Sequence, residues 1–541
     1  MTDVAGCGIR VDSVGSAPAI PWDLWHSSAL NAMSQPIEAY FEEHRVSNDL
    51  GHRAVRGGIV SILMQYGNGG FQIIGAIILA RILTPSDFGL VAIITVLTNF
   101  VPLLIDFGLG DATTQRSKIN PGQVSSLFWI TSGVGAAVAV VIAACSPLIA
   151  SVYHEPRLEA IALVSAITFV LWGLSNQHLA LLRRTMQFGR IAKIQLMGTL
   201  VGNLVAVALA LVGGGYWALV VRPIANALWV AVGAWRGCPW RPGTPVLDAE
   251  VKSMTRFGMH VMGFSITYSV AKSVDRILLA LFYRPAIVGY YQNATTLYEN
   301  SIFMALAQVH TVGSAALSKL QSDPAALAQR YEAALSTLAF FVMPLAVILS
   351  VTGEDVTVLL LGSKWRTAGW LLRIIALRGI FQVIESSQGW LHLSIGRADR
   401  WRNWGVVTLV VQIVAVLAGL HFGAEGVAIA CVIAIVLIAI PSVSYAGRPI
   451  GVGSAVVIRA VGPQLLGAMS ATAAGTWLQM SVLSHLPSIV RIIVSTSFCT
   501  CLYLIIVVGV FRLSEPLRVA RSVVRGRLRG HQQPSSDASA S

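Results

Sequence analysis

Three charged residues stand close together inside an apolar segment, where charge is costly. Lys272, Asp275 and Arg276 lie near the middle of a predicted membrane helix at 259–282, and their spacing of i, i+3 and i+4 puts them on one helical face. A charge at the bilayer centre costs about 2.5–3.5 kcal/mol on the insertion scale, so such residues face a partner or a watery cavity. One interpretation is an anion-holding cavity, and the other is an interhelical contact in which Lys272 and Asp275 neutralise each other. We favour the cavity because that pairing leaves Arg276 over.

The same face continues upstream, and a matching polar stripe occurs 200 positions earlier in the chain. Ser265 and Tyr268 extend the charged face. The offset of 200 maps the polar positions of this helix onto the first predicted helix, where the stripe consists of Gln65, Asn68 and Gln72. Carboxamides both donate and accept hydrogen bonds, as sugar hydroxyls do. The two faces therefore predict a cavity between two halves of the molecule that hydrogen-bonds sugars.

Further ionisable residues fall within predicted helices. Glu299 in the eighth helix has Asn99 as its repeat mate, and it either binds a proton or sodium ion for coupling or pairs with a cation of the seventh helix. Arg378 and Glu385 in the tenth helix are seven residues apart, so they share a face and are candidates for the same cavity.

The composition requires that most of the chain lie in lipid. Of 541 residues, 55% are hydrophobic and only 12% are charged, against about 25% charged in a soluble domain. A spanning helix needs about 20 apolar residues. Apolar runs predict an all-α, polytopic membrane protein of about 14 helices at 59–81, 88–110, 124–150, 158–181, 194–212, 216–235, 259–282, 287–312, 334–353, 368–393, 405–421, 425–445, 455–478 and 488–511.

The loop charges predict the orientation of these helices. The two tails and alternate loops hold about 26 Lys and Arg, in the loops 111–123, 182–193, 236–258, 313–333, 394–404 and 446–454. The opposite loops hold about six, namely Arg81, Arg157, Arg284, Lys364, Arg366 and Arg491. Because positive loops stay in the cytosol, both termini are expected there.

Two turns repeat within the chain and divide it into parts. Residues 79–89 share Leu, Ala, Pro and Gly with residues 279–289, and residues 213–218 resemble residues 423–428. Each pair occupies the same position in a set of six helices, which predicts a parallel repeat and a site between the halves, as in transporters. The expected parts are a cytosolic tail (1–57), two six-helix bundles (58–236 and 258–447) joined by a cytosolic linker (237–257), an extra helix pair (455–511) and a basic cytosolic tail (512–541).

Several functions are disfavoured by what the sequence lacks. No GxxxxGK[ST] loop is present, so the chain itself is not expected to be an ATPase. The net charge of +13 fits loops that set topology better than nucleic-acid binding, and the six cysteines lack zinc-ligand spacing. The short outer loops leave little room for a catalytic pocket. We therefore expect neither an enzyme nor a metal or other cofactor.

A set of short motifs resembles the Wzx-type polysaccharide flippases, most closely the colanic-acid and teichuronic-acid branch. The resemblance covers about residues 55–450 and is carried by LARILTPSDFGL (79–90), FGLG (107–110), DRIL (275–278), GYY (289–291), LSKLQSDP (317–324), LGSKW (361–365) and IGR (395–397). It departs from the family at the long N-terminal tail and at Arg276, where a neutral polar residue is expected.

This resemblance implies a member of the multidrug/oligosaccharidyl-lipid/polysaccharide exporter superfamily. Its fold would be two six-helix bundles plus two helices in the bacterial inner membrane, working by alternating access. The cargo would be an undecaprenyl-pyrophosphate-linked oligosaccharide moved to the outer leaflet for exopolysaccharide or lipopolysaccharide assembly. Membrane lipids, and polymerase and export machinery, would be its partners.

On this interpretation each candidate residue has a role. Lys272 and Arg276 would attract the pyrophosphate, within a substrate cavity that also includes Gln65, Asn68, Gln72, Tyr268 and Arg378. Coupling to a proton or sodium gradient would involve Asp275, Glu299 and Glu385. Two alternatives stay open: a drug/cation antiporter of the same superfamily, and a membrane polymerase or ligase acting on the same lipid intermediate.

Overall fold

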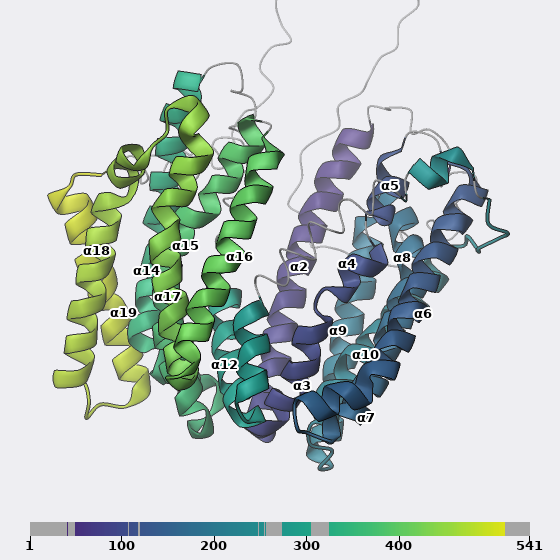
Figure 1. The fold of residues 1–541 in the computed structure, drawn as a ribbon, viewed down its shortest axis with the longest axis horizontal. Helices are drawn as coiled ribbons and strands as arrows, with labels where there is room; N and C mark the ends of the chain where they lie inside the picture. The colour runs from purple at the N-terminus through teal and green to yellow at the C-terminus, as the bar shows by residue number, and fades with distance from the viewer. Residues whose placement is uncertain are drawn as a thin grey trace, which may run out of the picture.

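The protein folds as two helical lobes that stand side by side (Figure 1). The computed structural model describes residue 41 and residues 49–106, 108–116, 119–246, 248–253, 255, 273–303, 324–395 and 397–513. Every regular element among these residues is helical, which confirms the predicted all-α class. We call residues 49–253 the N-lobe and residues 273–447 the C-lobe.

The N-lobe contains the first six of the predicted spans. Its helices are α2 (Asp49–Ile82), α3 (Pro85–Thr98), α4 (Val101–Asp106), α5 (Leu109–Gln115), α6 (Pro121–Val152), α7 (Arg157–Ser165), α8 (Ile167–Arg184), α9 (Phe188–Leu211) and α10 (Trp217–Gly237).

The C-lobe follows the same order and carries two further helices at its side. It comprises a helical segment at 273–282, then α12 (Pro285–Tyr298), the π-helix η3 (Glu299–Phe303), α14 (Pro324–Leu361), η4 (Ser363–Trp365), α15 (Arg366–Ile395), α16 (Ala398–Leu420), α17 (Gly423–Gly447) and η5 (Arg448–Ile450). The extra helix pair is α18 (Ser454–Ser481) and α19 (Ser488–Leu504), which ends in the π-helix η6 (Ile505–Val510).

The helices are long and apolar enough for a multi-pass membrane protein. Among the described residues, ten helical stretches satisfy the length and hydropathy of a membrane span. Each of the 14 predicted spans overlaps a helix or helical segment, although the seventh and eighth lie partly outside the described residues. The membrane fold is therefore confirmed, while the count of 14 stays a prediction.

The second predicted span is wrong as a single helix. The sequence predicts one helix at 88–110, but the structure divides it into α3, α4 and α5. Pro102 lacks a backbone N–H and disfavours a helical residue before it, so α3 cannot continue into α4 unbroken. Gly108 then adopts a φ of 76°, a left-handed conformation that ends α4 and starts α5 at a new angle.

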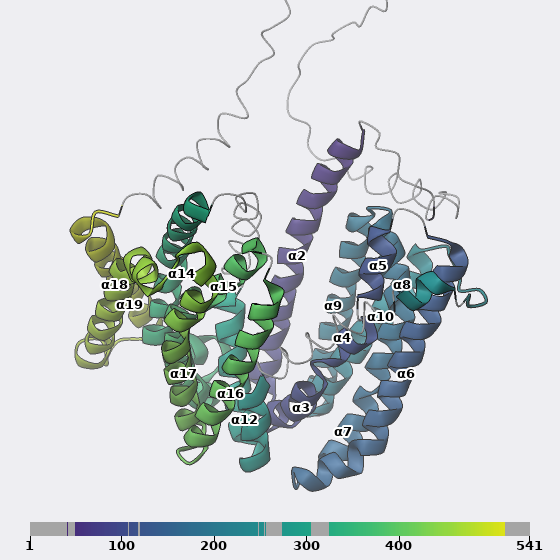
Figure 2. The same ribbon diagram turned by 45° about the horizontal axis from the view of Figure 1, so that its top comes forward.

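The repeat is visible in how the lobes meet. Helices α3 and α12 each have 14 residues, begin with proline at their first position and are offset by 200. They lie against each other at one end of the molecule, and the described parts of the two lobes diverge toward the other end (Figure 2). Val288 of the C-lobe packs in one buried cluster with Leu90 of the N-lobe. This end is sealed by apolar side chains.

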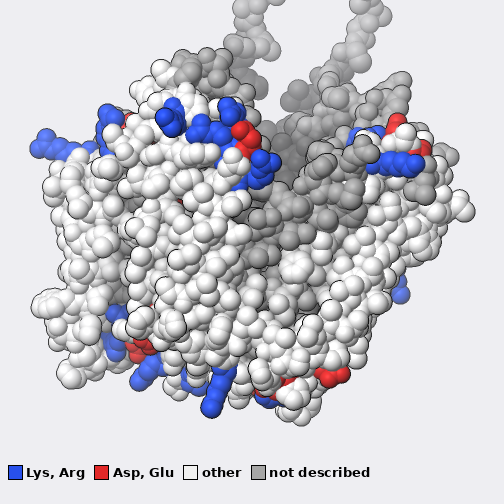
Figure 3. Space-filling model, viewed as in Figure 1, with Lys and Arg blue, Asp and Glu red and all other residues white. Residues whose placement is uncertain are grey.

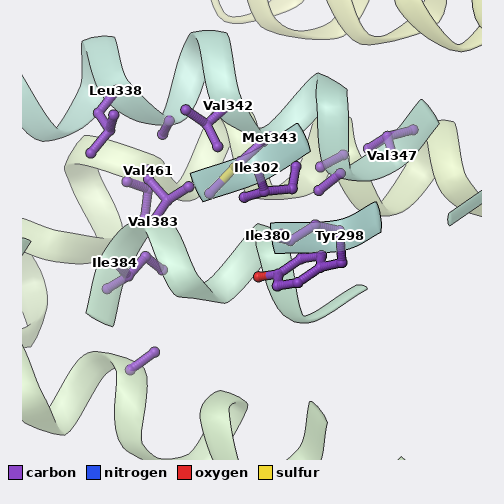
Figure 4. Close-up of a cluster of buried hydrophobic side chains, with 14 of the residues drawn as sticks. Tyr298, Ile302, Leu338, Val342, Met343, Val347, Ile380, Val383, Ile384 and Val461 are labelled. Atoms are coloured by element: carbon purple, nitrogen blue, oxygen red, sulfur yellow. The ribbon is translucent and has the colours of Figure 1, made fainter. Parts of the chain in front are cut away.

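The extra helix pair shares the core of the C-lobe. Figure 4 shows Tyr298 and Ile302 packed beside Met343 of α14 and Ile380 of α15. Val461 of α18 belongs to the same cluster. The pair is therefore a fixed part of this lobe.

The segment that leaves the N-lobe is held against that lobe. The Ser126 hydroxyl donates to the Val246 carbonyl at 2.7 Å and accepts from the Val246 N–H at 2.6 Å. The Gly243 N–H donates to the Ser125 hydroxyl at 3.0 Å, and Trp240 is buried. The predicted linker begins as an extension of the N-lobe.

Candidate functional site

The predicted site residues that the structure describes lie in two groups. Asp275, Arg276, Glu299, Arg378 and Glu385 belong to the C-lobe, and we call them the charged cluster. Gln65, Asn68 and Gln72 lie on α2 and are called the α2 stripe. Lys272 and Tyr268 lie outside the described residues, as does Ser265.

Arg276 is the centre of the charged cluster and is paired with two carboxylates. Its Nε lies 3.7 Å from Oδ1 of Asp275, and a terminal nitrogen lies 3.5 Å from Oε1 of Glu299. The expectation that Arg276 is left over is wrong, because both acids balance its charge. Pairing of Glu299 with a cation of the preceding helix, one of its two predicted roles, is confirmed.

The two carboxylates differ in their access to solvent. The side chains of Asp275 and Arg276 are 4% and 7% exposed, whereas that of Glu299 is 47% exposed. Glu299 is the first residue of η3, and π-helical turns are often found at functional sites. The carboxylate of Glu299 is therefore the more accessible of the two.

Asp275 is anchored by groups that the sequence did not single out. The Tyr291 hydroxyl of α12 donates to its Oδ2 at 2.9 Å, and the Arg276 backbone N–H donates to its Oδ1 at 2.8 Å. The Tyr291 ring is fully buried. The only signal for Tyr291 was its place in the GYY motif, since a buried tyrosine in a membrane helix looks like packing.

Arg378 adds a second guanidinium near this network. It interacts electrostatically with Asp275, Tyr291 and Tyr298. Its Nε has no hydrogen-bond partner among the described residues. Arg378 is therefore a cation with capacity to bind an acceptor.

Glu385 is held by two carboxamides of its own helix, and its predicted place in a cavity with Arg378 stays a prediction. Its two carboxylate oxygens accept hydrogen bonds from Gln382 at 2.7 Å and Gln388 at 2.8 Å, all on α15. Spacings of three residues bring these side chains together on one helical face. The two carboxamides were missed by sequence reasoning, and that spacing was the available signal.

The α2 stripe lies against the N-lobe and is only partly covered. Gln65 and Gln72 are exposed, and Asn68 is half-buried with an Oδ1 that lacks a partner among the described residues. Arg222 of α10 donates to the backbone carbonyl of Gln72 at 3.3 Å. Among the described residues, no hydrogen bond or ion pair joins the stripe to the charged cluster.

Comparison with known proteins places the chain in a family. A model of the family described as polysaccharide biosynthesis protein matches residues 78–369. The chain is 26% identical over 368 residues to the lipopolysaccharide biosynthesis protein WzxC of Escherichia coli, covering 66% of this chain and 73% of that protein. It is 23% identical over 357 residues to the teichuronic acid biosynthesis protein TuaB of Bacillus subtilis, covering 65% and 73%.

A solved structure shares the fold. The lipid II flippase MurJ, in an inward closed conformation, matches with a TM-score of 0.67 at 14% sequence identity, covering 84% of this chain and 99% of that chain. The family match spans more than half of the 541 residues, from the end of α2 to the start of α15. The chain is a multi-pass membrane protein that belongs to the polysaccharide biosynthesis protein family.

Proposed function

We propose that the protein flips a polyprenyl-pyrophosphate-linked oligosaccharide from the inner to the outer leaflet of the bacterial inner membrane, by alternating access. The product would feed exopolysaccharide or lipopolysaccharide assembly. Relatives named for lipopolysaccharide and teichuronic acid biosynthesis support this cargo class. The observation that carries the proposal is a pair of lobes in contact at one end, with the buried Asp275–Arg276 ion pair inside one of them.

The charged cluster gives a means of coupling cargo to an ion. A pyrophosphate carries negative charge and binds guanidinium groups through paired hydrogen bonds. If it takes the place of Glu299 on Arg276, the Glu299 carboxylate is released from its ion pair and becomes available to a proton or sodium ion. Cargo and ion would then occupy alternate positions on the same arginine.

The sugar would be held by uncharged polar groups. The α2 stripe offers carboxamides, exposed at Gln65 and Gln72, that would hydrogen-bond the sugars. Tyr268 and Lys272 keep the cargo-binding roles expected from the sequence. The hydrocarbon tail would stay in lipid. No resident cofactor is needed on this proposal, since the ion gradient supplies the driving force.

The α3–α12 end would face outward, with both termini in the cytosol. In support, five of the six Lys and Arg expected outside are held by acids or carbonyls of the fold: Arg81, Arg157, Lys364, Arg366 and Arg491. Lys and Arg side chains also gather at the other end, on both lobes (Figure 3). In the proposed orientation they would meet the anionic lipid headgroups of the cytosolic leaflet.

Two other functions are less well supported. A drug/cation antiporter of the same superfamily would need an acidic, aromatic cavity, whereas here each acid around Arg276 is already paired. A polymerase or ligase on the same lipid intermediate would need a pocket in an outer loop, and the described loops at the α3–α12 end are short turns.

A deletion strain separates these functions. We expect loss of the gene to stop polymer export and to leave the lipid-linked repeat unit in the inner leaflet, where a membrane-impermeant sugar-modifying reagent cannot reach it. Repeat units already in the outer leaflet would point to the polymerase or ligase instead. Drug sensitivity with normal polymer would point to the antiporter.

The cluster is tested in the same strain by restoring variants. Lys272→Ala with Arg276→Ala is expected to reduce polymer export at least tenfold at normal expression. Arg402→Ala, which removes an exposed cation from α16, is the control and should export normally. Full export by the double variant would refute the assignment of the cluster to the cargo.

A further inference from the structure

The ends of α2 and α14 cap each other across the boundary between the lobes. The last carbonyls of an α-helix have no partner within that helix. Arg81, in the last turn of α2, donates from Nε to the Leu360 carbonyl at 2.9 Å and from a terminal nitrogen to the Leu359 carbonyl at 2.6 Å. Lys364, just beyond α14, donates to the carbonyls of Arg81 and Leu83 at 2.9 and 2.6 Å. Each helix end thus supplies a cation that donates to the free carbonyls of the other helix. Positive charge at a helix C-terminus is also favoured by the helix dipole.

A buried tryptophan fills the space beneath these bonds. Trp365 is 0% exposed, and its Nε1 donates to the Ala80 carbonyl at 2.8 Å. Its ring meets Phe88 of the N-lobe edge-on at 5.1 Å and Tyr290 of the C-lobe at 6.0 Å between centroids. Gly362 makes the turn that brings it there, with a φ of 102° that only glycine adopts without strain.

Two glycines let the helices α3 and α12 touch at backbone distance. A Cβ on Gly89 would lie 1.6 Å from the Pro285 carbonyl oxygen, and a Cβ on Gly289 would lie 2.0 Å from that of Pro85. The two contacts are related by the repeat, since each glycine meets the proline that opens the opposite helix. No larger residue fits while the lobes are this close.

We infer that these contacts form a gate at the outward side of the cargo pathway, which must separate once in every transport cycle. We call Arg81, Lys364, Trp365 and the Gly89–Gly289 contact the outer clamp. The inference rests on the proposed function, because alternating access requires this end to open. It also gives a role to the LARILTPSDFGL and LGSKW motifs, which supply the two reciprocal caps.

The chemistry of the clamp suits repeated opening. All of its polar bonds end on helix-terminal carbonyls, which water can satisfy once the lobes part at the membrane surface. A hydrogen bond exchanged for water contributes little net free energy, so a few such bonds bias the closed state without locking it. A gate held by apolar contacts alone would be harder to open, because separating it exposes all of its apolar surface to water.

The clamp is tested by the access of a reagent to the closed gate. Leu361→Cys places a thiol in the sealed cluster, where the leucine is 3% exposed, in a background in which the six native cysteines are replaced. We expect Arg81→Ala with Lys364→Ala to raise its labelling rate by a membrane-impermeant maleimide added from outside by about tenfold or more. The matched control is Arg366→Ala, which removes a neighbouring cation paired with Glu354 of its own lobe and should leave labelling unchanged.

A second variant should open the same gate by adding a methyl group where α3 touches α12. Gly89→Ala should wedge α3 from α12 and raise labelling of the Leu361→Cys thiol, while Gly133→Ala on α6, where a Cβ meets no atom within 4 Å, should not. Unchanged labelling in both the double alanine variant and Gly89→Ala would overturn the clamp. The two proposals can fail separately. If the variants raise labelling but deletion of the gene leaves polymer export intact, the clamp stands and the proposed function is wrong.

Discussion

At the scale of single residues, the charged cluster shows how charge is made tolerable within a membrane lobe. Arg276 lies between a buried and a half-exposed carboxylate, so the ion pair is anchored on one side and exchangeable on the other. Tyr291 completes the coordination of Asp275. A buried carboxylate of this kind is costly unless its hydrogen bonds are satisfied.

The hydrogen bond from Tyr291 to Asp275 can be tested by measuring the stability of a variant. Tyr291→Phe removes the donor to Asp275 and should lower the free energy of unfolding by about 1–3 kcal/mol, because a buried charged acceptor is left short of a partner. The comparison is Tyr331→Phe, whose hydroxyl bonds the neutral Ser387 hydroxyl at 2.6 Å and should cost less. Thermal unfolding in detergent measures both, and an equal or smaller loss at Tyr291 would contradict the role given to it.

At the scale of elements, the extra helix pair is tied to the C-lobe by an ion pair at the end of α14. Asp355 of α14 has a side chain 5% exposed, and its Oδ2 lies 3.0 Å from a terminal nitrogen of Arg491 at the start of α19. Gln479 of α18 donates to the same oxygen. One carboxylate thus joins three helices.

This junction predicts unequal effects for two arginines. Arg491→Ala should destabilise the protein by about 1–3 kcal/mol, because it leaves the buried Asp355 carboxylate without its cation. Arg366→Ala breaks a pair whose arginine side chain is 72% exposed and should change stability by less than about 1 kcal/mol. Protease sensitivity of the segment between α18 and α19 should rise only in the first variant, and an equal rise in both would argue against the junction.

At the scale of the whole molecule, the orientation proposed above rests on the Lys and Arg of alternate loops. Most cations expected at the α3–α12 end pair with acids or donate to helix carbonyls. The start of α2 and the end of α19 lie at the same end of the molecule (Figure 1), as the predicted even number of spans requires.

Site-specific labelling measures this orientation. A cysteine in place of His485, in the exposed turn between α18 and α19, should react with an impermeant maleimide in intact cells with a permeabilised outer membrane. A cysteine in place of Arg448, exposed at the other end, should react only after the inner membrane is broken. The reverse labelling pattern would show that the protein has the opposite orientation in the membrane.

The sequence by itself determined the membrane class, the order of the helices and the pseudo-repeat. Apolar length and loop charge are local properties, so they can be read along the chain; the proline-initiated helices α3 and α12 duly appear 200 residues apart. Residues such as Arg276 and Glu299 were found because charge in an apolar run is rare.

Only the tertiary structure decided who pairs with whom. The sequence left open whether Glu299 pairs with a cation of the preceding helix, and the structure shows that it contacts Arg276. Arg81 and Lys364 looked like ordinary loop cations, although they bond carbonyls about 280 residues away. Such contacts depend on how helices are placed in space, a quantity that periodicity does not contain. The broken second span failed for a related reason, since Pro102 and Gly108 interrupt a run whose hydropathy is continuous.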